Sequence, residues 1–197
     1  MNALATAAAD ALHRRPRAPR SPAPALQPLD KLDRTHRKMV EVLVNLTELV
    51  NHLEDHGVDA SARQSAKAIC KFFADNARQH HADEETLVFP ALIRKGDKGM
   101  IQHVLRLQQD HGWLEEDWLE LAPQLQAVAQ GYSWYELDSL RHAVGVFVAL
   151  YHEHIALEES LIYPEARAHM AEEASCRAQR LAATGSSGGQ DGKGHGA

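Results

Sequence analysis

Two segments of the chain share a pattern of histidine, glutamate and proline. Residues 80–90 read His-His-Ala-Asp-Glu-Glu-Thr-Leu-Val-Phe-Pro, and residues 154–164, at an offset of 74, read His-Ile-Ala-Leu-Glu-Glu-Ser-Leu-Ile-Tyr-Pro. In each copy a histidine precedes a glutamate by four residues, which places both on one face of an α-helix. Imidazole and carboxylate groups on facing helices hold pairs of transition metals inside helical bundles. The repeated pattern therefore predicts a metal site built from at least two helices.

Four long segments have the hydrophobic periodicity of amphipathic helices, and no segment alternates as a strand would. We expect the helices at about residues 30–56, 60–93, 98–130 and 133–171. Because the connections between them are short, neighbouring helices should run antiparallel. The predicted fold class is all-α, an up-down-up-down antiparallel four-helix bundle.

The inward face of each predicted helix carries one histidine flanked by apolar residues. These are His36, His80, His111 and His154. A single inward histidine is usually an ordinary core residue, but counting up one helix and down the next brings all four to about the same height. Glu84 and Glu158 lie on the same faces, where burying an unpaired carboxylate is costly. No lysine or arginine lies there, so we predict a pair of metal ions as the partner.

Four imidazoles and two carboxylates, without a thiolate, favour iron or manganese over structural zinc. Each glutamate can bridge two metals through its two oxygens while the histidines fill terminal positions. Two metal ions held in this way would leave room for an oxo or hydroxo bridge between them. Such a pair has an open position where dioxygen, nitric oxide or peroxide could bind.

The arrangement of His36, His80-x-x-x-Glu84, His111 and His154-x-x-x-Glu158 resembles the hemerythrin-like (HHE cation-binding) domain. Flanking residues match as well: Leu-Asp-Arg-Thr-His-Arg at 32–37, Asp110 before His111, and Glu-Glu followed by an aromatic residue and proline. The resemblance covers about residues 30–170. It implies a non-haem di-iron centre with these six residues as ligands, so we expect two oxo- or hydroxo-bridged iron ions, with manganese or zinc less favoured. From the ligand set and its open position we expect this centre to bind or react with a small oxidant or diatomic in sensing or stress response.

Two positions differ from the oxygen-carrying hemerythrins. Glu115 stands where those proteins have a second histidine on the third helix, and Glu158 replaces an aspartate one residue further along. These differences argue against reversible oxygen carriage. Glu115 is either an additional metal ligand, a hydrogen-bond acceptor beside a ligand, or an exposed side chain. His81 falls off the inward face, and we expect it on a solvated surface.

Three other functions remain open from the sequence. The site could bind or store iron without redox turnover. It is also similar to bacterial di-iron proteins that repair iron–sulfur centres under nitrosative stress, although those carry a cysteine-containing N-terminal domain and residues 1–28 hold no cysteine. In the third, the metal only stabilises the bundle, and the two terminal segments bind a protein partner.

Composition sets the remaining expectations. The chain has 44% hydrophobic and 24% charged residues, which is typical of a globular domain. A net charge of −6 and the absence of a long apolar run indicate neither nucleic-acid nor membrane binding. Two cysteines favour a reduced, cytoplasmic setting. We expect a disordered Pro/Arg/Ala arm at 1–28, the bundle at 29–172 and a flexible tail at 173–197.

Overall fold

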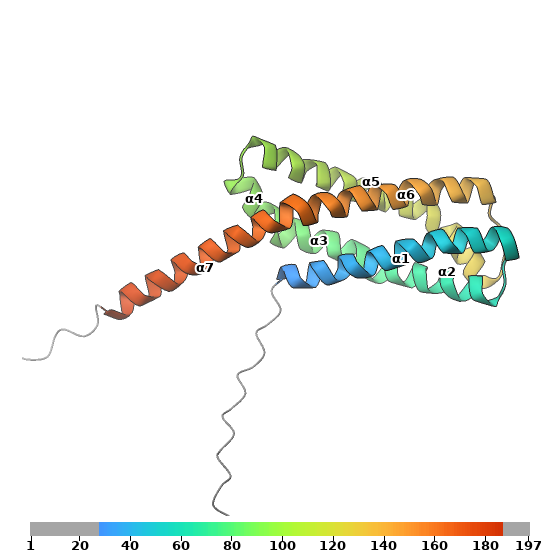
Figure 1. The fold of residues 1–197 in the computed structure, drawn as a ribbon, viewed down its shortest axis with the longest axis horizontal. Coiled ribbons are helices and arrows are strands. Elements are labelled where there is room, and N and C mark those ends of the chain that lie inside the picture. Colours follow the sequence, from blue (N-terminus) through green and yellow to red (C-terminus); the bar gives the residue numbers. More distant parts are fainter. Residues whose placement is uncertain (1–27, 187–197) are drawn as a thin grey trace, which may run out of the picture.

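The helices run back and forth along one long axis in the computed structural model, which describes residues 28–186 (Figure 1). In chain order they are α1 (Pro28–His56), α2 (Ala60–Phe72), η1 (Phe73–Ala77), α3 (Arg78–Leu87), α4 (Phe89–Lys95), α5 (Lys98–Gln130), α6 (Leu137–Leu157), η2 (Glu158–Ile162) and α7 (Tyr163–Ser186). No strand occurs among the described residues. The predicted all-α antiparallel bundle is confirmed.

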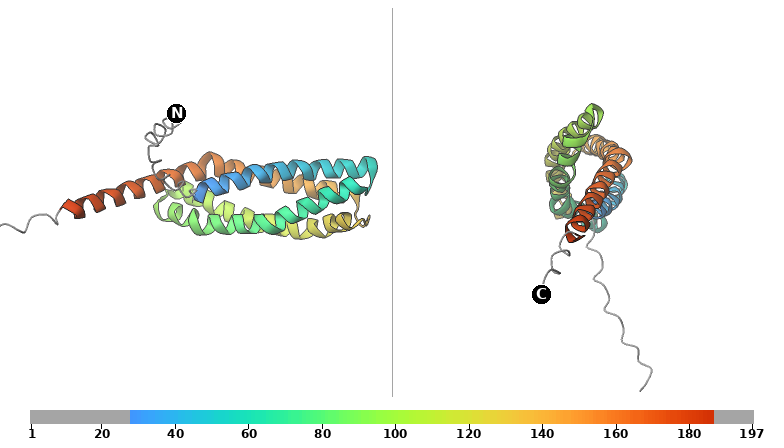
Figure 2. Two further views of the ribbon diagram at one scale, coloured as in Figure 1. Left: turned by 90° about the horizontal axis from the view of Figure 1, so that it is seen from below. Right: turned by 90° about the vertical axis from the view of Figure 1, so that its left-hand side faces the viewer.

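The elements form four long rods. One rod consists of α1, the second of α2 to α4 with η1, the third of α5, and the fourth of α6, η2 and α7. Contacts join α1 to α2, α2 to α5, α5 to α6 and α6 back to α1, so the rods surround a shared interior. Both views of Figure 2 show this side-by-side arrangement. Any inward side chain at mid-height can therefore meet partners from all four rods.

The second and fourth rods each contain a π turn, labelled η1 and η2. A π turn holds one residue more than an α turn, so it rotates the residues that follow relative to a regular helix. η1 ends just before the first copy of the repeated pattern, and both His80 and His81 then face the interior. His81 is only 9% exposed. The expectation that His81 lies on a solvated surface was therefore wrong.

The fourth rod differs from the expected segment at both ends. It begins at Leu137 rather than near residue 133, and it continues as α7 to Ser186 rather than ending near 171. Residues 171–183 are all exposed, and in Figure 1 this part of α7 extends beyond the bundle. Alanine, glutamate and arginine are frequent there, and they favour helix without burial. The expected arm and the end of the expected tail, residues 1–27 and 187–197, lie outside the described residues.

Two apolar clusters fill the interior. The larger includes Met39, Leu43, Leu46, Phe73, Leu114, Phe147 and Tyr151. The smaller includes Leu29, Leu32, Val88, Phe89, Leu107, Ile162 and Tyr163. His36 lies on α1 between Leu32 of the smaller cluster and Met39 of the larger. Polar side chains at the height of His36 therefore have an apolar cluster on each side. This enclosure keeps water from the polar side chains.

Shortening Leu43 to alanine should destabilise the bundle strongly. Leu43 is fully buried in the larger cluster, so the Leu43→Ala change leaves a cavity and should lower the free energy of unfolding by about 2–5 kcal/mol. Val44 is 49% exposed, and Val44→Ala serves as the control, with an expected effect within about 0.5 kcal/mol. Urea denaturation of both variants measures the difference. Equal losses would show that the packing at Leu43 is not as described.

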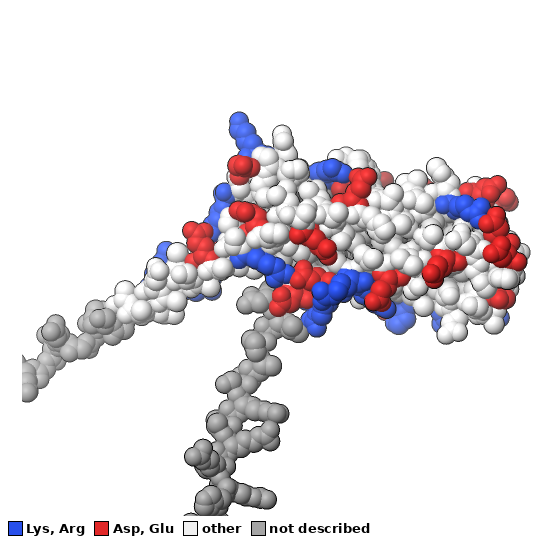
Figure 3. Space-filling model, in the orientation of Figure 1, with Lys and Arg blue, Asp and Glu red and all other residues white. Residues whose placement is uncertain are grey.

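Acidic and basic side chains alternate over the face seen in Figure 3, which therefore presents no continuous basic surface. Oppositely charged side chains also form ion pairs, as where Arg167 contacts Asp30 and Asp33. Within residues 28–186, no helix has the length and apolarity that crossing a lipid bilayer requires.

Candidate metal centre

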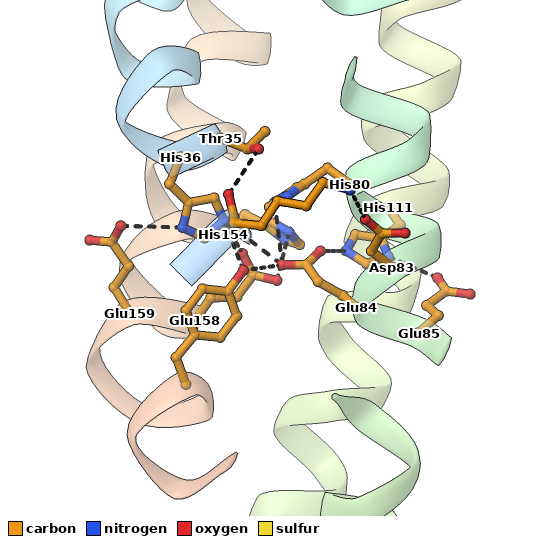
Figure 4. Close-up of polar contacts among 12 residues, drawn as sticks. Thr35, His36, His80, Asp83, Glu84, Glu85, His111, His154, Glu158 and Glu159 are labelled. Carbon is orange, nitrogen blue, oxygen red and sulfur yellow. Dashed lines mark hydrogen bonds and ion pairs between the residues drawn. The ribbon is translucent and has the colours of Figure 1, made fainter. Parts of the chain in front are cut away.

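Six buried polar side chains from all four rods meet in the interior (Figure 4). They are His36 from α1, His80 and Glu84 from α3, His111 from α5, His154 from α6 and Glu158 at the start of η2, and each is at most 5% exposed. We call this set the His/Glu cluster. The structure thus brings together the six residues that the sequence placed at one height.

The cluster forms two overlapping groups of potential metal ligands. One group is His36, His80, Glu84 and Glu158, and the other is Glu84, His111, His154 and Glu158. Within each group one ligand atom from every residue lies within 4.8 Å of the others. Both glutamates belong to both groups. We refer to the two sides as the His36 end and the His111 end.

The two carboxylates reach both ends with different oxygens. Glu84 Oε1 lies 3.3 Å from His80 Nε2, and Glu84 Oε2 lies 3.4 Å from His111 Nε2. Glu158 Oε2 lies 3.1 Å from His36 Nε2, and Glu158 Oε1 lies 3.2 Å from His154 Nε2. Each carboxylate therefore directs one oxygen to each end, the orientation needed to bridge two cations.

The second glutamate of each Glu-Glu pair holds a histidine on another rod. Glu85 Oε1 lies 2.8 Å from Nδ1 of His111, and Glu159 Oε1 lies 3.2 Å from Nδ1 of His36. A carboxylate on Nδ1 fixes the imidazole tautomer and leaves Nε2 free for a metal. Figure 4 shows both glutamates outside the cluster, each directed at its histidine. Glu85 and Glu159 were not anticipated from the sequence, although their repetition was a usable signal.

The aromatic residue before each proline also contacts a histidine of the cluster. Phe89 stacks on His111 with ring centroids 5.7 Å apart, and Tyr163 stacks on His36 at 5.1 Å. The Tyr163 hydroxyl donates a hydrogen bond to Glu84 Oε1 and lies 3.2 Å from His36 Nε2. Each copy of the repeated pattern thus supplies two cluster residues and supports a histidine from a different helix.

Many cluster atoms have no hydrogen-bond partner within the protein. Among the described residues, buried side-chain nitrogens or oxygens without such a partner belong to His80, His81, Glu84, Asp110, His111, His154, Glu158 and His169. All but His169 are members or immediate neighbours of the cluster. Buried polar atoms normally have a hydrogen-bond partner, and a bound ion is one established reason for an exception. The cluster atoms without a hydrogen bond form at most ion pairs with one another, and they are the ones that a bound cation would satisfy.

The two glutamates of the cluster differ in pKa. Burial and the nearby charge of Glu158 raise the pKa of Glu84 to about 7. Burial alone would raise the pKa of Glu158 too, but His154 and His36 hold it well below its usual value. In the metal-free protein, Glu158 is therefore the carboxylate that stays ionised, and Glu84 is the one that readily takes a proton.

Two histidines of the cluster, His80 and His154, also differ in pKa. Burial and the charge of His36 lower the pKa of His80 to about 3. Burial would also lower the pKa of His154, but the carboxylates of Glu158 and Asp110 raise it to about 10. His154 consequently keeps a proton at neutral pH that a metal would have to displace.

Glu115 lies apart from the cluster. Its side chain is 48% exposed and pairs with Arg78, Oε1 to Nη2, at 2.9 Å. Of the three alternatives for this residue, the exposed side chain matches its position. His81, by contrast, lies directly beside the cluster, with its ring stacked on that of His111.

Neutralising either supporting glutamate should weaken one end of the site. We expect Glu85→Gln to lower metal affinity at the His111 end, and Glu159→Gln at the His36 end, by about 10-fold or more, because each change removes a charged acceptor from a ligand histidine. Anaerobic calorimetric titration with ferrous iron measures both. Glu153 is exposed and ion-paired with Arg106, so Glu153→Gln should change nothing. Unaltered affinity in all three variants would contradict this orienting role.

Comparison with known proteins agrees with the geometry. A model of the hemerythrin HHE cation-binding domain matches residues 27–166, which include both copies of the repeated pattern and the whole His/Glu cluster. A Haemophilus influenzae protein, described only as an uncharacterized protein, is 31% identical over 126 residues, covering 64% of this chain and 71% of that protein. No solved structure matches the chain. The chain belongs to the hemerythrin HHE cation-binding domain family.

Proposed function

We propose that the protein is a non-haem di-iron protein that binds or reacts with dioxygen, nitric oxide or peroxide in sensing or stress response. The observation that carries the proposal is the His/Glu cluster, in which buried nitrogens and oxygens, most of them without a hydrogen bond, form two ligand groups with both carboxylates in common. A pair of cations would satisfy these atoms and neutralise the two buried carboxylates together.

The donor set supports iron as the metal. His36 and His80 would hold one ion and His111 and His154 the other, while Glu84 and Glu158 would bridge them. Imidazole and carboxylate without thiolate suit iron or manganese. Two bound iron ions would supply redox capacity and open coordination positions. The chain's own residues position the imidazoles through Glu85 and Glu159, and the two apolar clusters limit access of water.

A small cavity beside the cluster supports a small ligand. Its volume is about 210 Å³, and its wall includes buried His81 and Tyr151, with the Arg78–Glu115 ion pair among the outer residues. Pockets for organic ligands typically measure about 300–1,000 Å³, whereas a water molecule takes about 30 Å³ of liquid volume. The space suits a diatomic molecule or peroxide better than an organic substrate.

The test begins with anaerobic loading of the purified full chain with ferrous iron. We expect two iron ions per chain, and a new near-ultraviolet absorption after exposure to air, nitric oxide or peroxide. A Glu84→Gln/Glu158→Gln double variant should retain its helices but bind no iron and show no new absorption. Wild-type protein that binds no more than trace iron would refute the proposal.

The same experiment separates the alternative functions. Two bound iron ions without a spectral change under any of the three ligands would instead indicate iron binding or storage without redox turnover. Repair of iron centres would require that the loaded protein restores iron to a damaged iron–sulfur protein. That activity can be measured with a nitric-oxide-treated iron–sulfur enzyme as the acceptor.

A further inference from the structure

His81 breaks the internal symmetry of the repeated pattern. The first copy begins His80-His81, whereas the second begins His154-Ile155. Ile155 is 5% exposed and packs in the larger apolar cluster, as expected for a buried helix position. The corresponding position of the first copy is also buried, yet it carries an imidazole. The chain thus places a potential metal ligand where its own second copy has a core aliphatic residue.

The imidazole of His81 lies against the His111 end of the cluster. Its ring centroid is 4.0 Å from that of His111, with the planes 9° apart, and 5.7 Å from that of His154. One ring nitrogen from each of these three histidines lies within 4.8 Å of the others. His111 Nδ1 is already bound to Glu85, so its Nε2 faces the shared space.

His81 Nε2 is buried and has no hydrogen-bond partner in the part of the chain that the structure describes. No side-chain carboxylate forms an ion pair with His81 among the described residues. The rings that contact it belong to three histidines and one tyrosine: His80, His111, His154 and Tyr151. A buried nitrogen without a partner destabilises a folded protein unless a bound group satisfies it. A cation at the His111 end is the group that the three nitrogens together would bind, with the stacked rings of His81 and His111 turning so that a nitrogen of each faces the ion.

We propose that His81 is a third imidazole ligand of the metal at the His111 end. This inference rests on the proposed di-iron function. Within residues 28–186 the His36 end has no equivalent histidine, and there the Tyr163 hydroxyl donates to Glu84 instead. The two metals are therefore inequivalent, with three imidazoles at one end and two at the other.

The decisive variant is His81→Ile, which gives the first copy the residue found in the second. Anaerobic titration with ferrous iron should show two ions in the wild type. In the variant, one ion should bind with unchanged affinity and the other at least about 10-fold more weakly. Removing an outer hydrogen-bond partner of a ligand already lowers metal affinity by about 10-fold, and removing a direct ligand should lower it at least as much. Mössbauer spectra of the ferrous protein should show two signals in the wild type, of which only one changes in the variant.

Stability distinguishes a ligand from a packing residue. The metal-free His81→Ile variant should be at least as stable as the metal-free wild type, since the change removes an unpaired buried nitrogen. With iron bound, the order should reverse and the variant should melt at the lower temperature. A packing role would destabilise both forms. His152 is an exposed histidine of α6, and His152→Gln should match the wild type in every measurement.

The outcomes separate this inference from the proposed function. Wild-type protein that binds no iron overturns both. Two ions bound by His81→Ile and by His81→Gln, with wild-type affinity and unchanged Mössbauer signals, overturn the ligand role of His81 alone. The glutamine variant also covers the case in which the isoleucine variant does not fold, a condition that circular dichroism detects.

Discussion

Glu158→Gln and Glu84→Gln should both abolish binding of two metals, but only Glu158→Gln should destabilise the metal-free protein. Each carboxylate contributes an oxygen to both ligand groups, so either change affects both ions. We expect affinity for ferrous iron to fall by at least about 100-fold in each variant. Removing an outer hydrogen-bond partner of a ligand lowers metal affinity by about 10- to 100-fold, and each of these changes removes a direct ligand of both ions.

The two metal-free variants should differ because the glutamates differ in charge. Glu158 stays ionised between His36 and His154, with which it forms buried ion pairs. Removing one partner of a buried pair leaves the other uncompensated, so Glu158→Gln should cost about 3–5 kcal/mol of unfolding free energy. Burial and Glu158 raise the pKa of Glu84 to about 7, so a neutral amide at that position removes repulsion. Its oxygen still accepts the Tyr163 hydroxyl.

Urea denaturation in the presence of a chelator measures the metal-free stabilities, and titration measures the affinities. Glu115→Gln is the control, because its exposed ion pair with Arg78 contributes little, about 0–1 kcal/mol, and lies outside the cluster. If the Glu115→Gln variant failed to bind iron, Glu115 would have to be a metal ligand after all. Equal stability of the two cluster variants would contradict the assigned charges.

The fold and the six cluster residues could be predicted because both depend on helical periodicity. A histidine and a glutamate four residues apart on an apolar face must share an inward direction in any regular helix. Height could be estimated as well, since the rise per residue is constant. His36 and His111 were therefore linked to the repeated pattern although they lie outside it.

His81 could not be placed because η1 interrupts the regular helix before it. Periodicity counted through residues 73–77 as an α-helix assigns His81 to the surface, whereas the extra residue of the π turn rotates it inward. Glu85 and Glu159 were missed for another reason. Both are partly exposed, and their role depends on which histidine of another rod lies opposite. That contact follows from the packing of the rods, which periodicity within a single helix does not determine.

Affinity for ferrous iron should rise steeply with pH, since metal ligands must be deprotonated to bind. In the metal-free protein the pKa of Glu84 is raised to about 7 and that of His154 to about 10. Below pH 7 both groups release a proton on binding, and His36, whose pKa burial would lower but the nearby carboxylates raise, adds to this release, so affinity should change by at least about 100-fold per pH unit. Between pH 7 and 10 only His154 of this pair does so, and the slope should fall to about 10-fold. His80, with a pKa of about 3, adds nothing.

The stability of the metal-free protein should show the opposite trend. Unfolded histidine has a pKa near 6.5, so the raised value of His154 contributes stability that is fully present below pH 6.5 and is lost as pH rises toward 10. Glu84 acts in the same direction between its unfolded pKa of about 4.5 and its folded value of about 7. The lowered pKa of His80 acts in the opposite direction below pH 6.5, because the unfolded chain then binds a proton that the folded protein does not, so the net loss of stability begins at about pH 7. The metal-loaded protein should not weaken in this way, because the cation replaces the proton of His154 and neutralises Glu84. Melting temperatures of the loaded and metal-free forms should therefore diverge from pH 7 upward, and parallel curves would mean that the cation does not displace these protons.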